Sequence, residues 1–372
     1  MKKNLITMLL LLIAVTALFT ACGGKKDVIK IGVVGAHSGD LASYGLPTVK
    51  AAELVAAKWN ENGGVLGKQV ELVVEDDVCK PEVAANSAAK VVGEGVVAVI
   101  GHICSGATKS ALGIYNEAGI PCISPSATNP PLTKSGEYPN FFRTIAPDDA
   151  QAETDANFIV NNLKLKKVAI LHDRQDYGKG FADFCVAALE KMGVEIVLYE
   201  GITDSALDYS AILTKVAASG AEGIVYGGYH PEASKLVQQM SQIGLNIPFI
   251  SDDGVKDDTF IKVAGKFSEG VYASGPVDTS SNAMNIQAVK DHVEAYGEDP
   301  GAFFINAYAA SEALMNAIDK AGSTDGAAIM KALRSEYVET PLGKISFDDK
   351  GDAIGVGFSV YQVQNGTYVE LK

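Results

Sequence analysis

The chain has 372 residues and a formal net charge of −14, with 45 acidic against 31 basic side chains. An excess of acid this large excludes binding to nucleic acid or to anionic lipid through surface charge. A chain of this length is also too long for one typical hydrophobic core, so we expect two domains.

The N-terminus has the features of a secretion signal. Lys2 and Lys3 precede an apolar run over residues 5–19, which is short for a membrane span, and small residues follow it. Cys22 then stands where bacterial lipoprotein signals are cleaved and where the new N-terminal cysteine receives its lipid. An ordinary signal peptide with an unrelated cysteine is the alternative, and Phe19 stands where leucine is usual. We expect a lipoprotein signal peptide at 1–21, an anchor and linker at 22–27, and lipidation of Cys22.

Export has consequences for the rest of the chain. Cleavage removes two lysines and no acid, so the net charge of the mature chain falls to about −16. We predict an extracytoplasmic protein that touches the cell membrane only through its lipid. Four further cysteines, at 79, 104, 122 and 185, enter a compartment where disulfides form. The sequence alone allows three pairings of four cysteines, and not all of them need pair.

Short β-rich runs alternate with helical patterns from residue 28 onward. The first half has predicted strands at 28–34, 68–75 and 96–100, and predicted helices at 46–60, at 81–92 and from about 105. The alternation restarts after Pro147, with strands at 168–171, 194–199, 223–226 and 248–250 and helices near 178–192, 208–219 and 231–243. Apolar strands separated by helices of this length predict two doubly wound parallel sheets, joined near residue 147.

The C-terminal part departs from this alternation. Two helices are predicted near 282–296 and 302–321. The last segment is β-rich, and its two runs, 355–363 and 367–371, flank Asn365-Gly366. Because an Asn-Gly pair between two β-rich runs favours a tight turn, we predict a β-hairpin at the C-terminus.

Ligands of open parallel sheets bind beyond the carboxyl ends of the strands. Six predicted strand ends are followed by hydroxyls, tyrosines and single carboxylates, at 35–44, 101–108, 124–128, 172–178, 227–231 and 251–254. This mixture suits a small zwitterion. Ser105, Thr128 and the amides at the start of the helix near 105 can bind a ligand carboxylate. Asp253 or Asp148 can pair with a ligand ammonium. The other interpretation of Ser105 is a simple helix N-cap.

Sequence patterns of catalytic sites are weak or absent. The chain has no Gly-x-Ser-x-Gly elbow, no P-loop, no dinucleotide-binding glycine motif and no His-Glu-x-x-His. Its five histidines lack metal-ligand spacing, and neither Asp76-Asp77 nor Asp252-Asp253 lies in a calcium-loop pattern. We therefore predict a protein without catalytic residues, metal or cofactor.

In combination, these segments resemble the periplasmic branched-chain amino acid binding proteins of ABC uptake systems, of the leucine/isoleucine/valine type. The most specific matches are the cysteines at 79 and 104 and the Tyr-Gly-Gly-Tyr-His-Pro block at 226–231. The other matching stretches, in order over nearly the whole mature chain, are 33–39, 44–45, 62–64, 76–81, 101–105, 125–128, 172–178 and 301–303.

The resemblance implies a type I periplasmic-binding fold, an α/β fold in which two doubly wound parallel-sheet lobes are joined by three crossovers. The ligand of such a fold lies in the cleft between the lobes. On that pattern we expect the first lobe to comprise 28–147 plus 276–353, and the second lobe to comprise 148–275 plus 354–372.

The resemblance also implies roles for individual residues. The first lobe would bind the α-carboxylate and α-ammonium through Ser105, Ser126, Ala127 and Thr128. The second lobe would reach the same groups through Tyr229 and Asp253, although family members usually have glutamate where Asp253 stands and alanine where Ser126 stands. The ligand side chain would be surrounded by Tyr44, Ile103, Tyr177 and Phe303. A disulfide would join Cys79 to Cys104 and leave Cys122 and Cys185 free and buried.

We interpret the function as capture of an extracytoplasmic branched-chain or similar aliphatic amino acid by lobe closure. A monomer would then deliver the amino acid to the membrane permease of an ABC importer, with no bond made or broken. One alternative is a ligand sensor of the same fold that passes its state to a partner protein. The other is a secreted hydrolase that uses Ser105 or an aspartate pair, although no general base can be assigned to it.

Overall fold

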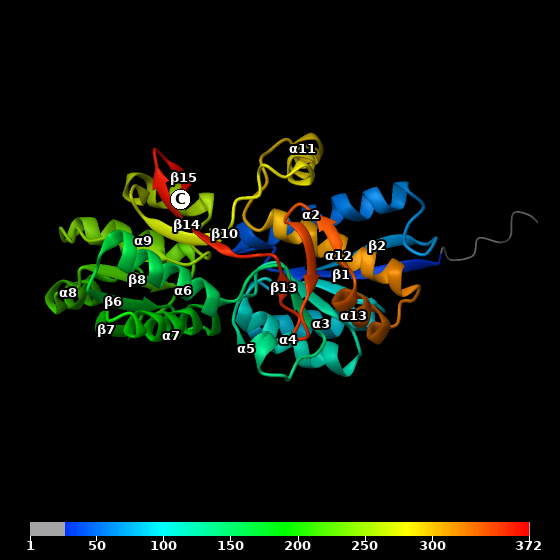
Figure 1. Cartoon of the computed structure of the whole chain (residues 1–372), viewed down its shortest axis with the longest axis horizontal. Coiled ribbons are helices and arrows are strands. Elements are labelled where there is room, and N and C mark those ends of the chain that lie inside the picture. The colour runs from blue at the N-terminus through cyan, green and yellow to red at the C-terminus, as the bar shows by residue number, and fades with distance from the viewer. Residues whose placement is uncertain (1–26, 372) are drawn as a thin grey trace, which may run out of the picture.

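Buried, β-branched strands form the centre of two separate sheets in this computed structural model, which describes residues 27–371. The two sheets with their helices form two units that lie side by side along the long axis of the molecule (Figure 1). The predicted signal peptide and Cys22 lie outside the described residues.

The first unit is built on a five-stranded parallel sheet in the order β2-β1-β3-β4-β5. Its strands are β1 (Val28–Gly35), β2 (Gln69–Asp76), β3 (Ala98–Gly101), β4 (Cys122–Ser124) and β5 (Phe141–Arg143). One face packs on α2 (Ala42–Glu61), α12 (Phe304–Ala321) and α13 (Gly326–Ser335), and the other packs on α3 (Pro81–Gly93) and α4 (Ser105–Glu117). The unit also contains α5 (Pro131–Lys134), α11 (Ala283–Tyr296) and a small sheet of β11 (Val338–Thr340), β12 (Gly343–Phe347) and β13 (Ala353–Ile354).

The second unit is built on a seven-stranded sheet in the order β15-β14-β10-β9-β8-β6-β7. Its parallel strands are β6 (Lys167–His172), β7 (Glu195–Gly201), β8 (Gly223–Gly227), β9 (Phe249–Ser251) and β10 (Tyr272–Pro276). One face packs on α8 (Ser210–Ser219), α9 (His230–Gln242) and α10 (Asp258–Ala264), and the other packs on α6 (Asp148–Phe158) and α7 (Asp176–Lys191). The antiparallel edge is the predicted hairpin of β14 (Phe358–Gln364) and β15 (Thr367–Glu370).

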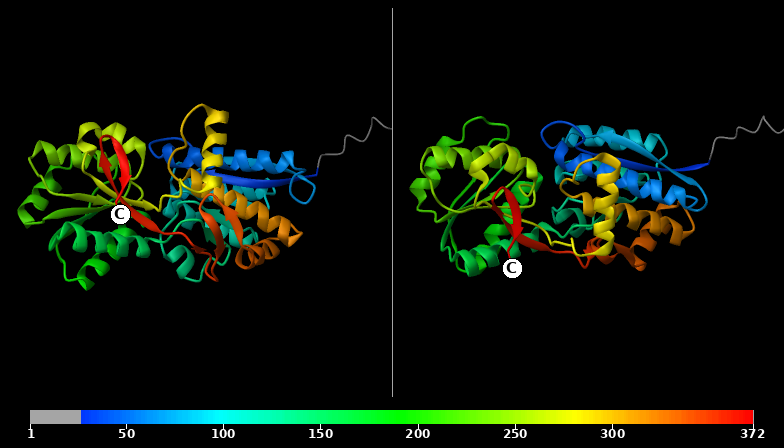
Figure 2. Two further views of the ribbon diagram at one scale, coloured as in Figure 1. Left: turned by 45° about the horizontal axis from the view of Figure 1, so that its top comes forward. Right: turned by 90° about the horizontal axis from the view of Figure 1, so that it is seen from above.

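The chain passes between the two units three times. It leaves the first unit after β5, returns to the helices and the small sheet of that unit after β10, and enters the second unit again at β14. Figure 2 shows the last of these passages as the red strand that runs from the first unit to the C-terminal hairpin. The predicted architecture, two doubly wound parallel-sheet units joined by three crossovers, is confirmed.

Most predicted elements are present with small shifts in their ends, whereas α6, α10, α13, β5 and β10 were not predicted. Helix α6 follows Pro147 directly but was not predicted, because its buried side mixes Asp148, Gln151 and Asp155 with Ala152, Ala156 and Phe158. A buried face that is half polar gives only a weak hydrophobic periodicity. The predicted hairpin is confirmed, and Asn365 and Gly366 both have positive φ, 53° and 73°, as its tight turn requires.

Candidate ligand site between the two units

A small cavity lies where the strand ends of the two sheets face each other. It is lined by Tyr44, Ile103, Ser105, Ser126, Tyr177, Tyr229, Asp253, Gly254 and Phe303. Eight of the eleven residues expected at the site are in this lining. The cavity volume is about 20 Å³, room for about one water molecule. The walls must therefore move apart before any larger molecule can enter.

The parallel topology explains why distant residues meet here. In the first unit, Tyr44 lies in the first turn of α2, Ser105 begins α4 after β3, and Ser126 follows β4. In the second unit, Tyr177 lies in the first turn of α7, and Asp253 follows β9. All of these positions follow the carboxyl ends of parallel strands, which share one edge of each sheet. Phe303 instead precedes α12 and adopts a positive φ of 60°.

The first unit contributes two serine hydroxyls to the cavity wall, at Ser105 and Ser126. Ser105 is 2% exposed, and its Oγ accepts a hydrogen bond from the Asn129 main-chain N–H at 3.3 Å. The Oγ of Ser126 donates to the Ile103 carbonyl oxygen at 3.0 Å. Because Ser105 is also the first residue of the 13-residue helix α4, the positive end of the helix dipole points toward the cavity wall at this place. This wall is suited to an anionic group.

A single carboxylate faces the cavity from the second unit. Asp253 is 2% exposed, and its Oδ1 accepts a hydrogen bond from the Tyr177 hydroxyl at 2.5 Å. The same hydroxyl accepts from the Gly254 N–H at 3.0 Å. Burial raises the pKa of Asp253 to about 6, and the hydrogen bond from Tyr177 partly offsets this effect. Asp253 is therefore charged at neutral pH and suited to a cationic group.

Aromatic rings form the remaining walls and join the two units. The ring of Tyr44 lies 5.9 Å from that of Tyr229 and 5.8 Å from that of Phe303, and the rings of Tyr177 and Tyr229 are 5.1 Å apart. The Tyr44 hydroxyl also donates to the Gly254 carbonyl oxygen across the interface, at 2.5 Å. The aromatic rings give the cavity an apolar lining, and the tyrosine hydroxyls are its polar groups. Such a lining suits an aliphatic side chain.

Three expected site residues do not line the cavity. Ala127 is fully buried, and its carbonyl oxygen accepts from the Arg143 guanidinium behind the wall. Thr128 Oγ1 and both carboxylate oxygens of Asp148 are buried and have no hydrogen-bond partner among residues 27–371. Burial and the nearby charge of Asp253 raise the pKa of Asp148 well above its usual value. Asp148 is therefore the neutral member of this pair of acids, and Asp253 is the charged one.

Gly254 lies in the predicted strand-end segment 251–254 but was not among the residues expected to contact the ligand. It contributes main-chain groups, an N–H and a carbonyl oxygen, and has no side chain that marks it as a binding residue. A Cβ at this position would lie 2.5 Å from the Gly228 carbonyl oxygen and 2.9 Å from the Tyr177 ring. Glycine is therefore required for the close packing, and its position directly after Asp253 is the one sequence signal that could have found it.

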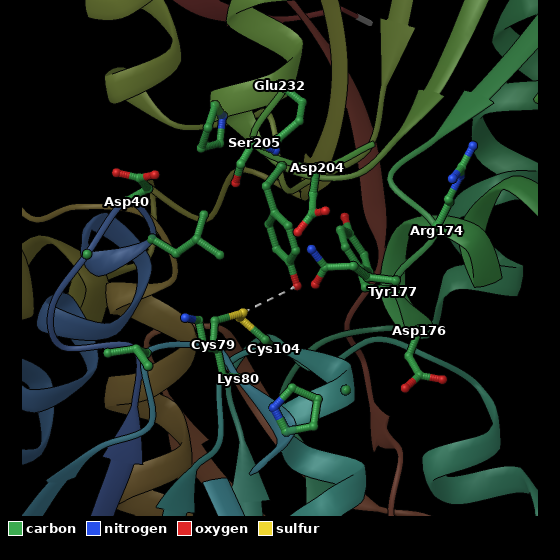
Figure 3. A pocket seen from close by; sticks show the side chains of 18 of the residues that line it. Asp40, Cys79, Lys80, Cys104, Arg174, Asp176, Tyr177, Asp204, Ser205 and Glu232 are labelled. Atoms are coloured by element: carbon green, nitrogen blue, oxygen red, sulfur yellow. Dashed lines mark hydrogen bonds between the residues drawn. A yellow bond between two sulfur atoms is a disulfide. The ribbon is translucent and has the colours of Figure 1, made fainter. Parts of the chain in front are cut away.

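A larger groove of about 800 Å³ leads away from the cavity, and Tyr177 and Tyr229 line both spaces. Figure 3 shows Asp204 and Glu232 of the second unit on one side of it and Cys79, Lys80 and Cys104 of the first unit on the other. Cys79 and Cys104 form a disulfide, the pair that the resemblance implies, and the Tyr229 hydroxyl lies 4.0 Å from Cys79 Sγ. Cys122 and Cys185 are free and buried.

Groups that would indicate catalysis are not assembled at this site. The Ser105 hydroxyl contacts a main-chain N–H and not a histidine. His102 is fully buried elsewhere, between Asp77 at 2.6 Å and the Tyr115 hydroxyl at 2.9 Å. Across residues 27–371, no three histidine, cysteine or acidic side chains come together as metal ligands. In the same part of the chain, every helix is too short or too polar to cross a bilayer.

Comparison with known proteins agrees with this geometry. The periplasmic binding protein family matches residues 28–367. The leucine-, isoleucine-, valine-, threonine- and alanine-binding protein of Pseudomonas aeruginosa is 37% identical over 356 residues, which cover 95% of each chain. The Leu/Ile/Val-binding protein of Escherichia coli K12 is 36% identical over 346 residues, 92% of this chain and 93% of its own.

A solved structure shares the same architecture. It is the branched-chain amino acid transporter substrate-binding protein LivJ of Streptococcus pneumoniae, in complex with isoleucine. It is 30% identical with a TM-score of 0.82, and the match covers 92% of this chain and 100% of that one.

Proposed function

Because the chain belongs to the periplasmic binding protein family, we propose that it captures a branched-chain or similar aliphatic amino acid and delivers it to the permease of an ABC importer. The observation that carries this proposal is the division of charge across the cavity. Ser105 and the start of α4 would receive an anionic group, Asp253 of the second unit would receive a cationic group, and aromatic rings line the same cavity. An aliphatic zwitterion satisfies all three features.

The ligand groups can be assigned to these walls. The α-carboxylate would accept hydrogen bonds from Ser105 and the first amides of α4, with Thr128 in support. The α-ammonium would pair with Asp253, and Tyr44, Ile103, Tyr177, Tyr229 and Phe303 would enclose the side chain. Two findings support an aliphatic ligand: the names of the relatives specify leucine, isoleucine and valine, and the neighbouring solved structure contains isoleucine.

We further propose that lobe closure provides access. The lobes would comprise 28–147 plus 276–353 and 148–275 plus 354–372, in keeping with the three passages of the chain between the sheets. A cavity the size of one water cannot admit an amino acid without separation of its walls. Hinge motion at the three passages would separate these walls. The open and closed forms need differ by only a few kcal/mol for the ligand to select the closed form.

The direct test is identification of the ligand. Protein purified from its host and denatured should release an amino acid that mass spectrometry identifies. Calorimetric titration of stripped protein should then give tight binding of leucine, isoleucine or valine and no binding of aspartate or glutamate. Absence of binding to every aliphatic amino acid would reject the proposed function. Incubation with amino acid amides should give no turnover, which separates a binding protein from a hydrolase.

Binding should weaken in acid, because the ammonium of the ligand needs a charged partner. The pKa of Asp253 in the ligand-free protein is raised to about 6, so the carboxylate is ionised above this pH and protonated below it. We expect the Kd for leucine to be nearly constant above about pH 7 and to rise by about tenfold per pH unit below pH 6. Titrations at pH 5, 6 and 7.5 measure the trend. An unchanged Kd at pH 5 would mean that Asp253 is not the counter-charge.

The membrane anchor can be tested separately from the ligand. We propose that Cys22 carries the lipid and that the protein acts as a monomer on the outer side of the cytoplasmic membrane or in the periplasm. The full chain should fractionate with membranes in a bacterial host, whereas Cys22→Ser should be released or remain unprocessed, because its diacylglycerol and amine-linked chain would be lost. Normal cleavage of Cys22→Ser with continued membrane binding would contradict the lipoprotein assignment.

A further inference from the structure

The two units touch at a second place, beside the ligand cavity. Asn129 lies in the segment that follows β4. Its side chain donates from Nδ2 to the main-chain carbonyl oxygen of Asp176, in the first turn of α7, at 2.5 Å. On the same side, Lys109 Nζ of α4 lies 3.2 Å from Asp176 Oδ1. The Lys109 pair is about half exposed and contributes little by itself. The Asn129 contact is therefore the more specific link.

Asn129 also connects to both ends of the proposed ligand site. Its own main-chain N–H donates to Ser105 Oγ, the hydroxyl assigned to the ligand carboxylate, at 3.3 Å. Its partner Asp176 directly precedes Tyr177, whose hydroxyl binds the acid assigned to the ligand ammonium. One residue thus touches the carboxylate-binding group and the helix that carries the partner of Asp253.

The structure makes room for this contact through a glycine. A Cβ on Gly180 of α7 would lie 2.4 Å from Asn129 Nδ2, so any larger residue displaces the amide from its position. Gly180, Asn129, Asp176 and Ser105 all line a surface groove of about 400 Å³, and Ser105 also lines the ligand cavity. The Asn129 contact therefore lies in the outer groove, next to Ser105, the residue that this groove shares with the cavity.

We propose that Asn129 is a positioning residue that fastens the two lobes over the ligand carboxylate and so sets how long the ligand stays bound. The inference rests on the proposed function. The Asn129 side chain contacts α7 only when the two units are together, so this contact does not take part in the first encounter with the ligand. Its loss should therefore raise the dissociation rate of the ligand and leave the association rate nearly unchanged.

The test compares two glycine-to-alanine substitutions in helices. Gly180→Ala should displace Asn129, whereas Gly113→Ala, on the exposed side of α4, meets no atom within 4 Å. Both replacements favour the helix, so neither should lower the melting temperature. We expect Gly180→Ala and Asn129→Ala each to speed leucine dissociation by about three- to tenfold in stopped-flow measurements, the loss that one hydrogen bond predicts. Gly113→Ala should match the parent.

The outcomes separate the two proposals. Dissociation of leucine from Gly180→Ala and Asn129→Ala at the parental rate would overturn the role of Asn129 while leaving the proposed function intact. An equal fall in association rate, or a faster dissociation in Gly113→Ala as well, would also overturn it, because the effect would then be a general change of structure. A parent protein that binds no aliphatic amino acid would instead reject the proposed function itself.

Discussion

Replacement Asp253→Ala is expected to weaken amino acid binding by about 2–5 kcal/mol, the cost of burying a charge without its partner. The ligand ammonium would lose its counter-charge in a site where Asp253 is 2% exposed. Because the structure buries this residue, solvent cannot replace the lost interaction. The fold should survive, because burial raises the pKa of Asp253 to about 6 and ionised Asp253 therefore costs stability in the ligand-free protein at pH 7.5.

Asp252 provides a matched control for this substitution. Asp252 is the neighbouring acid and is also buried, but it does not line the cavity. Its Oδ2 accepts a hydrogen bond from the Gly228 N–H at 2.9 Å. Asp252→Asn should leave the Kd for leucine, isoleucine and valine unchanged. The corresponding keto acids, which lack the ammonium, should bind the parent weakly and lose little further affinity in Asp253→Ala. Equal binding of keto acid and amino acid by the parent, or unchanged affinity in Asp253→Ala, would make Asp148 the next candidate.

Replacement Arg143→Met is expected to lower the free energy of unfolding by about 3–5 kcal/mol. Arg143 is fully buried, and its Nε pairs with Asp352 Oδ1 at 2.6 Å. Its remaining N–H groups donate to the carbonyl oxygens of Ala127 and Asn129 and to the hydroxyl of Thr133, at 2.6 to 3.2 Å. Methionine fills much of the volume but leaves Asp352 and these oxygen atoms without partners, which is the costly part of the change.

Urea unfolding of the ligand-free protein measures this effect. Lys30→Met removes a surface ion pair with Glu94 at 3.4 Å and should cost at most about 1 kcal/mol. The double variant Arg143→Met with Asp352→Asn should recover part of the loss, because the unpaired charge is then gone. A midpoint for Arg143→Met equal to that of Lys30→Met would show that the buried ion pair does not stabilise this part of the first unit.

Local sequence patterns are sufficient for the elements whose signals are short-range. Apolar strands at 28–34 and 168–171 and the helices between successive strands follow from periodicity, and Asn365-Gly366 specifies the hairpin through its positive φ values. The topology rule for parallel sheets then predicts the strand ends as the ligand site. Of the residues assigned to ligand groups on that basis, Ser105 and Asp253 line the cavity, whereas Thr128 and Asp148 do not. Individual roles such as those of Tyr44 and Phe303 came from the resemblance to a family.

Other features exist only through packing between distant segments. Helix α6 escaped detection because its buried face is half polar. Its Gln151 donates to the Ser274 hydroxyl of β10, and the same hydroxyl donates to Asp155. Gly254 became part of the site through main-chain groups, and its contact with Tyr44 joins residues 210 positions apart. The sequence by itself determined which side chains stand at strand ends. The tertiary structure alone decided which of them meet, because burial, pKa and hydrogen-bond partners depend on how the two units pack together.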